Sequence, residues 1–222
     1  IETVTIAYKG KVEHNDSTGA GGIIEEGGIQ WMTSGKGILH KEYHEKNFSK
    51  KGGEMQMVQL WANLPAKDKM TEPKYQNIEN KDLAKVDLGN GIGSIDIIAG
   101  EFEKNKGPAS SFTPLSLFNI KLNKGKGTSL SFNESHNTGL LIIKGNVTIN
   151  NKEKVPTNHF VLFENKGKEF TIKAEDEAEI LVLSGEPIDE PIASYGPFVM
   201  NTNDEIKQTI DDFNSGKFGY LD

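Results

Sequence analysis

Cysteine is absent from the 222-residue sequence, so disulfide bonds, thiolate-bound zinc and cysteine nucleophiles are excluded. Long apolar runs are absent too, and none approaches the roughly 20 residues that a helix needs to span a bilayer. Positive charge is in deficit, because the formal net charge is −7. This balance argues against binding of nucleic acid or of an anionic membrane by the bulk surface. We expect a cytoplasmic protein whose partners are neither nucleic acids nor membranes.

Glycine is abundant, with 24 residues, and this favours short strands joined by frequent turns. The length allows one large all-β domain or two domains of about 100 residues each. The first residue is Ile1 rather than Met, and residues 1–8 already have the pattern of a strand. We therefore expect that the sequence is a fragment or that an upstream segment precedes it.

The chain contains two similar segments, residues 6–16 and residues 141–151, which lie about 135 positions apart. In each, an apolar strand leads through a Lys-Gly break into an alternating strand and an Asn-rich turn. A period this long indicates a duplicated domain rather than a solenoid, although two unrelated hairpins are the alternative. The residues that coincide are Lys9, Gly10, Val12 and Asn15 in the first copy and Lys144, Gly145, Val147 and Asn150 in the second.

Other segments agree with two antiparallel β units. Residues 104–108 are rich in Gly, Pro and Lys and lack apolar side chains, so we place the boundary there and expect domains 1–105 and 106–222. Apolar patterning predicts further strands at residues 55–61, 93–98, 115–122 and 179–183.

One helix is predicted near the end of the chain, at residues 203–215. Thr202 or Asn203 can cap its N-terminus, and Gly216 can end it. An isolated helix of this length is marginal in water, so we expect it to pack on a barrel as a structural element. Its apolar stripe consists of Ile206, Ile210 and Phe213.

His40 and Glu42 carry the clearest chemical signal. They follow a turn with two glycines, and if a strand begins at His40, both side chains face the same way. Histidine and carboxylate ligands suit a metal ion that keeps open coordination positions. A solvent-facing pair on a strand is the alternative. His44 and Glu45 are alternative ligands, although the lysines around them indicate a solvated loop.

The chain resembles the pirin family, a two-barrel group of the cupin superfamily. The resemblance covers the whole length and implies an all-β fold of two tandem cupin domains. Each would be an antiparallel β-barrel of the jelly-roll type, and a C-terminal helix would follow them. The similar blocks are residues 1–5 (IETVT), 30–33 (QWMT), 40–42 (HKE), 59–65 (QLWANLP), 67–70 (KDKM), 196–202 (GPFVMNT) and 216–219 (GKFG).

In that family the N-terminal cupin holds one iron or similar divalent metal through three histidines and a glutamate. His40 and Glu42 match one histidine and the glutamate. The other two histidines belong to an H-P-H-x-G block that would stand immediately before Ile1. We therefore expect the metal to be bound weakly or not at all by this chain alone.

The second barrel is expected to be metal-free, as the resemblance also implies. The stretch that matches His40 falls at residues 171–174 and contains no histidine. We expect His136 and His159 to be surface or packing residues. His14 follows the Lys-Gly break at a hairpin turn, and we expect it to be exposed to solvent.

The resemblance leaves two functional hypotheses. In the first, the protein is a dioxygenase similar to quercetin 2,3-dioxygenase, with Glu42 as metal ligand and base for the flavonol proton. Trp31 and Trp61 would line a pocket for the planar aromatic substrate, although either can instead be a core residue. In the second, the protein is a metal- or redox-sensing regulator that binds transcription factors or metabolic enzymes. A third possibility is a family member that has lost its metal and its chemistry.

Overall fold

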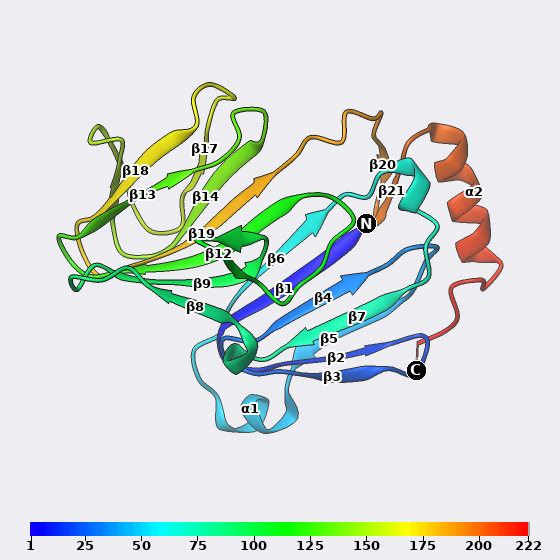
Figure 1. Cartoon of the computed structure of the whole chain (residues 1–222). Coiled ribbons are helices and arrows are strands. Elements are labelled where there is room, and N and C mark those ends of the chain that lie inside the picture. The colour runs from blue at the N-terminus through cyan, green and yellow to red at the C-terminus, as the bar shows by residue number, and fades with distance from the viewer. Residues whose placement is uncertain (222) are drawn as a thin grey trace. The chain divides into compact units, whose positions relative to one another are not determined.

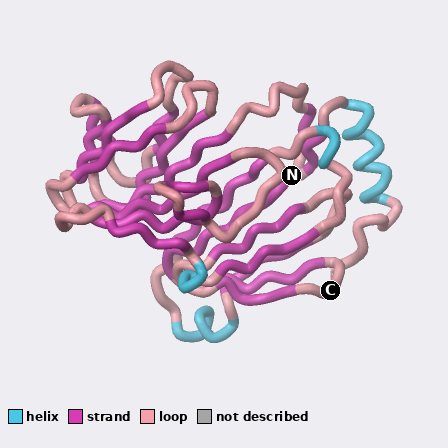
Figure 2. Tube along the Cα trace, in the orientation of Figure 1, coloured by secondary structure: helices cyan, strands magenta, loops and turns pink. Residues whose placement is uncertain are grey.

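The computed structural model describes residues 1–221 and divides the chain into two compact units. The first comprises residues 1–82 and the C-terminal segment from Ile188, and the second comprises Leu83–Pro187. Both units consist mostly of antiparallel strands (Figures 1 and 2). The predicted fold class, all-β with two cupin-type barrels and a C-terminal helix, is confirmed.

The first unit contains two facing sheets, which we call the first barrel. Ala7, Val12 and Ile24 form a buried cluster at one end, where the inner faces of the two sheets meet. The larger sheet has the order β6-β1-β4-β7, with β1 Glu2–Lys9, β4 Ile29–Thr33, β6 Gln56–Ala62 and β7 Lys74–Ile78. The smaller sheet has the order β3-β2-β5, with β2 Val12–Asp16, β3 Gly21–Ile24 and β5 His40–His44.

The remaining elements of the first unit are short. The predicted C-terminal helix is confirmed as α2, where Thr202 is the N-cap and Glu205 completes a capping box. Helix α1, by contrast, falls in a segment expected to be a solvated loop. No helix within residues 1–221 is long and apolar enough to cross a membrane. The elements are α1 Lys46–Lys51, the 3-10 helices Ala66–Asp68 and Asn80–Asp82, β20 Ala193–Tyr195, β21 Phe198–Met200 and α2 Asn203–Asn214.

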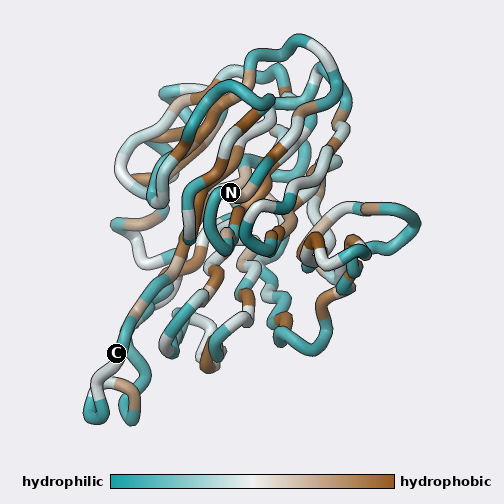
Figure 3. The backbone as a smooth tube through the Cα atoms, turned by 90° about the vertical axis from the view of Figure 1, so that its left-hand side faces the viewer, coloured by the Kyte–Doolittle hydropathy of each residue, from teal (hydrophilic) through white to brown (hydrophobic). Residues whose placement is uncertain are grey.

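The second unit contains the second barrel, a six-stranded sheet ordered β17-β14-β19-β12-β9-β8 and a four-stranded sheet ordered β13-β18-β15-β16. A continuous cluster of buried aliphatic and aromatic side chains fills the space between them. In Figure 3 the hydrophobic stretches follow the strands, and the outer loops are mostly hydrophilic. The strands are β8 Ala84–Asp87, β9 Gly93–Ala99, β10 Glu101–Phe102, β11 Asn105–Lys106, β12 Leu115–Leu122, β13 Gly127–Ser131, β14 Asn137–Lys144, β15 Val147–Ile149, β16 Glu153–Val155, β17 Phe160–Leu162, β18 Glu169–Ala174 and β19 Ala178–Gly185.

The strand pairing confirms the duplication. Strand β1 lies between β4 and β6, as β14 lies between β17 and β19. Likewise β2 lies between β3 and β5, as β15 lies between β16 and β18. Gly10 and Gly145, the glycines of the two Lys-Gly breaks, have φ angles of 83° and 78°. These left-handed conformations are readily adopted only by glycine.

The units divide the chain at positions other than the boundary expected at residues 104–108. Strands β8 and β9 precede that boundary, yet they pair with each other, and β9 pairs with β12 of the second barrel. After Pro187 the chain returns to the first unit, where the hydroxyl of Ser17 donates a hydrogen bond to the carbonyl of Phe218. The second unit therefore begins at Leu83 instead of residue 106 and ends at Pro187 instead of residue 222.

Candidate active site in the first barrel

Strand β5 begins at His40, which meets the condition for a shared face, so His40 and Glu42 project from the same face of the strand. In β2, Asp16 lies directly opposite His40, and His14 lies directly opposite Glu42. Directly opposed residues of an antiparallel pair share a face. All four side chains therefore lie on the inner face of the smaller sheet, together with the buried Val12.

Two hydrogen bonds orient the carboxylate of Glu42. The hydroxyl of Thr5, on β1, donates to Glu42 Oε1 over 2.8 Å. The amide of Gln59, on the neighbouring strand β6, donates to Glu42 Oε2 and, over 3.1 Å, to the Thr5 hydroxyl. The larger sheet therefore fixes a carboxylate that belongs to the smaller one.

His14 is buried, with 3 % of its surface exposed, so the expectation of a solvent-exposed residue is wrong. Strand β2 continues through Asp16 before it turns, and the alternation of the strand directs His14 inward. The ring stacks on Tyr75 of β7 with a centroid distance of 5.7 Å. Burial lowers the pKa of His14, and the nearby charge of Glu42 opposes this effect.

Several polar atoms inside the barrel are buried without a hydrogen-bond partner in the protein. Buried polar groups in native proteins are nearly always paired, with protein, water or a ligand. This part of the barrel is therefore suited to hold a polar ligand or ordered water. The atoms are Nδ1 and Nε2 of His14, Nδ1 of His40 and Nε2 of Gln30.

Asp16 organises the rim of the site. One carboxylate oxygen accepts hydrogen bonds from the backbone N–H and the hydroxyl of Thr18, over 2.7 and 2.6 Å. Burial works to raise the pKa of Asp16, but the hydrogen bonds from Thr18 and Ala20 outweigh it and leave the pKa below its ordinary value. Burial, reinforced by Asp16, raises the pKa of the Tyr75 hydroxyl. At neutral pH this side of the site therefore carries an ionised carboxylate and a neutral phenol.

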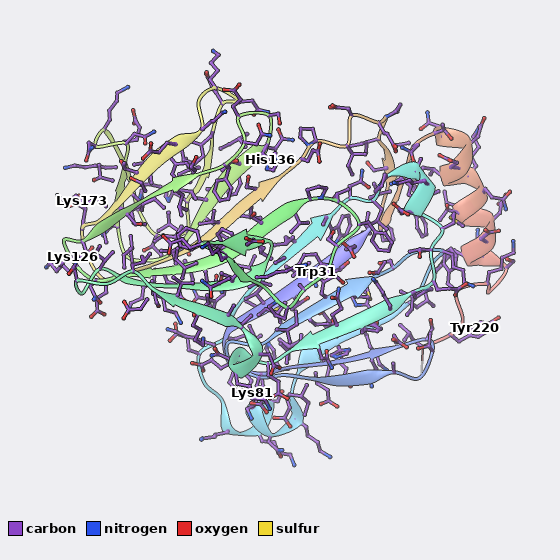
Figure 4. All side chains as sticks on the ribbon, viewed as in Figure 1. Trp31, Lys81, Lys126, His136, Lys173 and Tyr220 are labelled. Carbon is purple, nitrogen blue, oxygen red and sulfur yellow. The ribbon has the colours of Figure 1, made fainter. Side chains whose placement is uncertain are left out.

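The two tryptophans lie on different faces of the larger sheet. Trp31, which is labelled in Figure 4, is fully buried. It lies opposite Val4 in the strand register, so it projects from the face that does not carry Thr5. It is a core residue, which was the alternative to a pocket wall. Trp61 lies opposite Thr3, on the same face as Thr5, and 52 % of its surface is exposed. The core alternative for Trp61 is therefore wrong, and it remains a candidate pocket wall.

The other candidate residues have different surroundings. The carboxylate of Glu45 accepts hydrogen bonds from the first N–H groups of α1 and so serves as its N-cap. His44 lies at the exposed end of β5, and its ring is nearly perpendicular to that of Phe48, with 6.0 Å between the ring centroids. In the second barrel, His136 lies 3.3 Å from the hydroxyl of Ser184, and His159 is exposed. These positions agree with surface or packing roles for both histidines.

The residues present match a metal site in kind but not in number. His40 and Glu42 offer the imidazole and carboxylate donors that divalent metals accept, and His40 Nδ1 is buried without a partner. Within residues 1–221, however, no three His, Asp or Glu side chains come together as a metal-binding group. A closed site therefore needs further ligands beside these two.

The second barrel provides an internal comparison for the inner face of the smaller sheet. Ile149 of β15 lies opposite Ile172 of β18, at the positions that correspond to His14 and Glu42. Both isoleucines are fully or almost fully buried in the core of that barrel. The same strand arrangement is thus compatible with two aliphatic residues where the first barrel has an imidazole and a carboxylate.

The larger sheet shows the same replacement. In the first barrel a polar row crosses the inner face beside Glu42, whereas the corresponding row of the second barrel is aliphatic. The fold itself does not require the polar row, so its polarity is better explained by a ligand. The first row consists of Gln59, Thr5 and Gln30, and the second of Val182, Leu140 and Val161.

Comparison with known proteins adds two family matches and close structural relatives. The family model described as Pirin matches residues 1–62, and the Pirin C-terminal cupin domain matches residues 117–219. A Pseudomonas aeruginosa protein, provisionally named quercetin 2,3-dioxygenase, is 43 % identical over 98 % of this chain and 76 % of its own length.

Two further relatives cover nearly the whole chain. The crystal structure of a quercetin 2,3-dioxygenase from Acinetobacter baumannii is 46 % identical and superimposes with a TM-score of 0.96, covering 100 % of this chain and 77 % of its own. A pirin-like protein of Solanum lycopersicum is 36 % identical over 99 % of this chain and 74 % of its own length.

Proposed function

This chain belongs to the pirin family, and from that premise we propose that it is a metal-dependent dioxygenase that cleaves flavonol-type aromatic substrates with O2. The observation that carries the proposal is the polar interior of the first barrel, which the second barrel replaces with aliphatic residues. The similarity to proteins named quercetin 2,3-dioxygenase supports this substrate class.

Glu42 accepts the proton of the substrate hydroxyl in this proposal. Each of its carboxylate oxygens already accepts one hydrogen bond, from Thr5 or from Gln59, and each retains acceptor capacity for a proton or a metal. Because the two donors fix the carboxylate, little reorganisation is needed when the substrate hydroxyl approaches.

The metal is held by His40 and Glu42 together with further ligands, and we propose iron. Bound there, it would activate the substrate oxygens as a Lewis acid and provide the redox chemistry for O2. We expect residues 1–221 alone to bind the metal weakly, since they supply only two ligands, His40 and Glu42.

Trp61 and Met57 provide the apolar side of the substrate site. Both project from the inner face of the edge strand β6, on either side of Gln59, and both are partly exposed. An exposed aromatic ring beside a polar row can contact the face of a planar substrate while its hydroxyl groups reach Glu42. Trp31 has no part in this site.

Protein expressed from the full gene tests the proposal. We expect elemental analysis to find about one metal ion per chain, and aerobic incubation with quercetin to show loss of the flavonol with uptake of O2. His40→Ala is expected to abolish both. His159→Ala, an exposed histidine of the second barrel, is the matched control. Flavonol turnover that survives in a metal-free His40→Ala protein would refute the mechanism.

A regulatory role is the second candidate function. The net charge of −7 favours a protein partner, such as a transcription factor or a metabolic enzyme, over direct contact with DNA. The same experiment separates the two candidates, because a regulator would bind the metal at His40 without consuming quercetin.

A further inference from the structure

His14 is a deeply buried polar side chain of the site, and the proposed mechanism gives it no task. Its exposed fraction is 3 %, and neither ring nitrogen has a hydrogen-bond partner in the protein. Leaving a buried polar group unpaired costs about 1–3 kcal/mol, so a partner from outside the chain is expected at this ring.

The surroundings of His14 restrict where that partner can lie. The ring is stacked on Tyr75, with an angle of 28° between the planes, which covers one face. On the side of β3, a Cβ atom added to Gly22 would come within 3.0 Å of Nε2, so the backbone of β3 lies close to that nitrogen. Glu42 lies directly opposite on β5. A ligand that reaches the carboxylate of Glu42 therefore also comes within reach of the imidazole.

The second barrel shows that this position does not need a histidine for the fold. Ile149 occupies the corresponding place, opposite Ile172, and both are buried in an apolar core. The first barrel differs from the second at both positions of this pair: it has His14 in place of Ile149 and Glu42 in place of Ile172. A shared ligand explains why the two polar residues occur together.

We propose that His14 is a substrate-binding residue, whose ring N–H donates a hydrogen bond to the flavonol oxygen whose proton Glu42 accepts. The inference rests on the proposed function, since it names a contact of the same substrate. The imidazole and the carboxylate then approach one oxygen from two neighbouring strands. A site that hydrogen-bonds a substrate hydroxyl discriminates strongly against an analogue that lacks it.

The test uses protein from the full gene, loaded with its metal and titrated without O2, so that binding is measured in the absence of turnover. Quercetin is compared with luteolin, which lacks the 3-hydroxyl group. His14→Ile takes the residue of the second barrel and is expected to raise the Kd for quercetin about tenfold or more, while the Kd for luteolin stays unchanged. His159→Ile is the control and is expected to leave both values unchanged.

Gly22→Ala provides a second variant that keeps the imidazole but displaces it. Because the added Cβ would lie 3.0 Å from Nε2, we expect a smaller rise in the Kd for quercetin and again no change for luteolin. Metal content should remain that of the wild type in both variants, and loss of metal from His14→Ile would overturn the assignment. Equal losses for the two flavonoids would likewise overturn it, because they would indicate a structural role.

The outcomes separate the two proposals. If the wild-type protein binds and cleaves quercetin but His14→Ile binds it equally well, the role of His14 is refuted and the proposed function stands. If the wild-type protein binds no quercetin, both are refuted.

Discussion

Thr5 and Thr33 make similar hydrogen bonds on opposite faces of one sheet. The Thr5 hydroxyl donates to Glu42 over 2.8 Å on the inner face, and the Thr33 hydroxyl donates to the buried Glu2 over 2.8 Å on the other. The two bonds are alike in chemistry and length, yet only the first touches the proposed site. The pair therefore separates the contribution of such a bond to activity from its contribution to stability.

We predict that Thr5→Val impairs activity, whereas Thr33→Val impairs only stability. In the full protein, Thr5→Val should lower kcat/KM for quercetin about tenfold, because Glu42 loses one of the two donors that orient it. Thr33→Val should leave kcat/KM unchanged and lower the free energy of unfolding by about 1–3 kcal/mol, because Glu2 stays buried with one bond fewer. Steady-state kinetics and urea unfolding measure both. Equal losses of activity in the two variants would contradict the prediction.

The sequence predicted His40 and Glu42 as a pair because their two-residue spacing needs only the start of a strand. It failed for His14, although Val12, His14 and Asp16 alternate as inner residues of a strand do. Because an Asn-rich turn follows, the turn was predicted to begin at His14, whereas the strand continues to Asp16. The contacts of Thr5, Gln59 and Tyr75 with this group join residues far apart in sequence, and no local pattern reveals them.

The turns between strands depend on glycines whose replacement has two separable costs. Gly145 and Gly125 both have a left-handed backbone, with φ angles of 78° and 74°. A Cβ on Gly145 would collide with the carbonyl oxygen of Glu177, whereas a Cβ on Gly125 would meet nothing within 4 Å. The first turn is therefore restricted by both conformation and space, and the second by conformation alone.

Gly145→Ala should consequently destabilise the protein more than Gly125→Ala. Gly125→Ala, the control, is expected to lower the free energy of unfolding by about 1 kcal/mol, because alanine is strained in the left-handed conformation. The loss for Gly145→Ala should exceed this, since backbone must also move. Chemical unfolding of the two variants side by side measures the difference, and equal losses would show that the turn relaxes freely.

Helix α2 depends on its capping box, in which Thr202 and Glu205 bind each other's backbone N–H groups. Hydrogen bonds from Thr202, helped by one from Asn201, hold the pKa of Glu205 below its ordinary value. A carboxylate whose pKa is lower in the folded state stabilises the fold above its unfolded pKa. That contribution is lost as the pH falls through the lower, folded value.

We predict that Glu205→Gln lowers the thermal stability of the protein at pH 7 and that its difference from the wild type shrinks as the pH approaches 3. Thr202→Ala should cost about 1 kcal/mol from the loss of the cap. Glu164→Gln, at an exposed position in the second barrel, is the control. Calorimetry across this pH range measures the effect, and a difference independent of pH would exclude the carboxylate as its source.

Single strands were predictable because each is set by local alternation, and β12 has the predicted bounds of residues 115–122. The division into units was not, because it depends on which strands pair. Strands β8 and β9 belong to the second barrel through the pairing of β9 with β12. A Gly/Pro-rich stretch at residues 104–108 indicates a break in regular structure but not a change of sheet.

At the scale of the whole chain, the two barrels share one fold and differ in what fills it. The second has an aliphatic interior, whereas the first holds a partly exposed carboxylate, Glu42, whose partners are the buried hydroxyl of Thr5 and the exposed amide of Gln59. Polar groups on an inner face lose part of their contact with water even when they are paired, and replacing a complete set with apolar residues is often neutral or stabilising. The first barrel therefore gives up stability for its site, as functional sites commonly do.

This trade-off predicts that the site can be removed while stability is gained. The triple variant Thr5→Leu, Gln59→Val and Glu42→Ile takes the three corresponding residues of the second barrel, Leu140, Val182 and Ile172. Because carboxylate and donors leave together, we expect an unchanged or higher free energy of unfolding, by about 0–3 kcal/mol, and loss of the metal and of flavonol binding. Glu42→Ile alone should lose function equally but be less stable than the wild type, since the buried hydroxyl of Thr5 is left without its acceptor. Urea unfolding and elemental analysis measure both properties in the full protein. A triple variant less stable than Glu42→Ile would show that the polar row supports the fold itself.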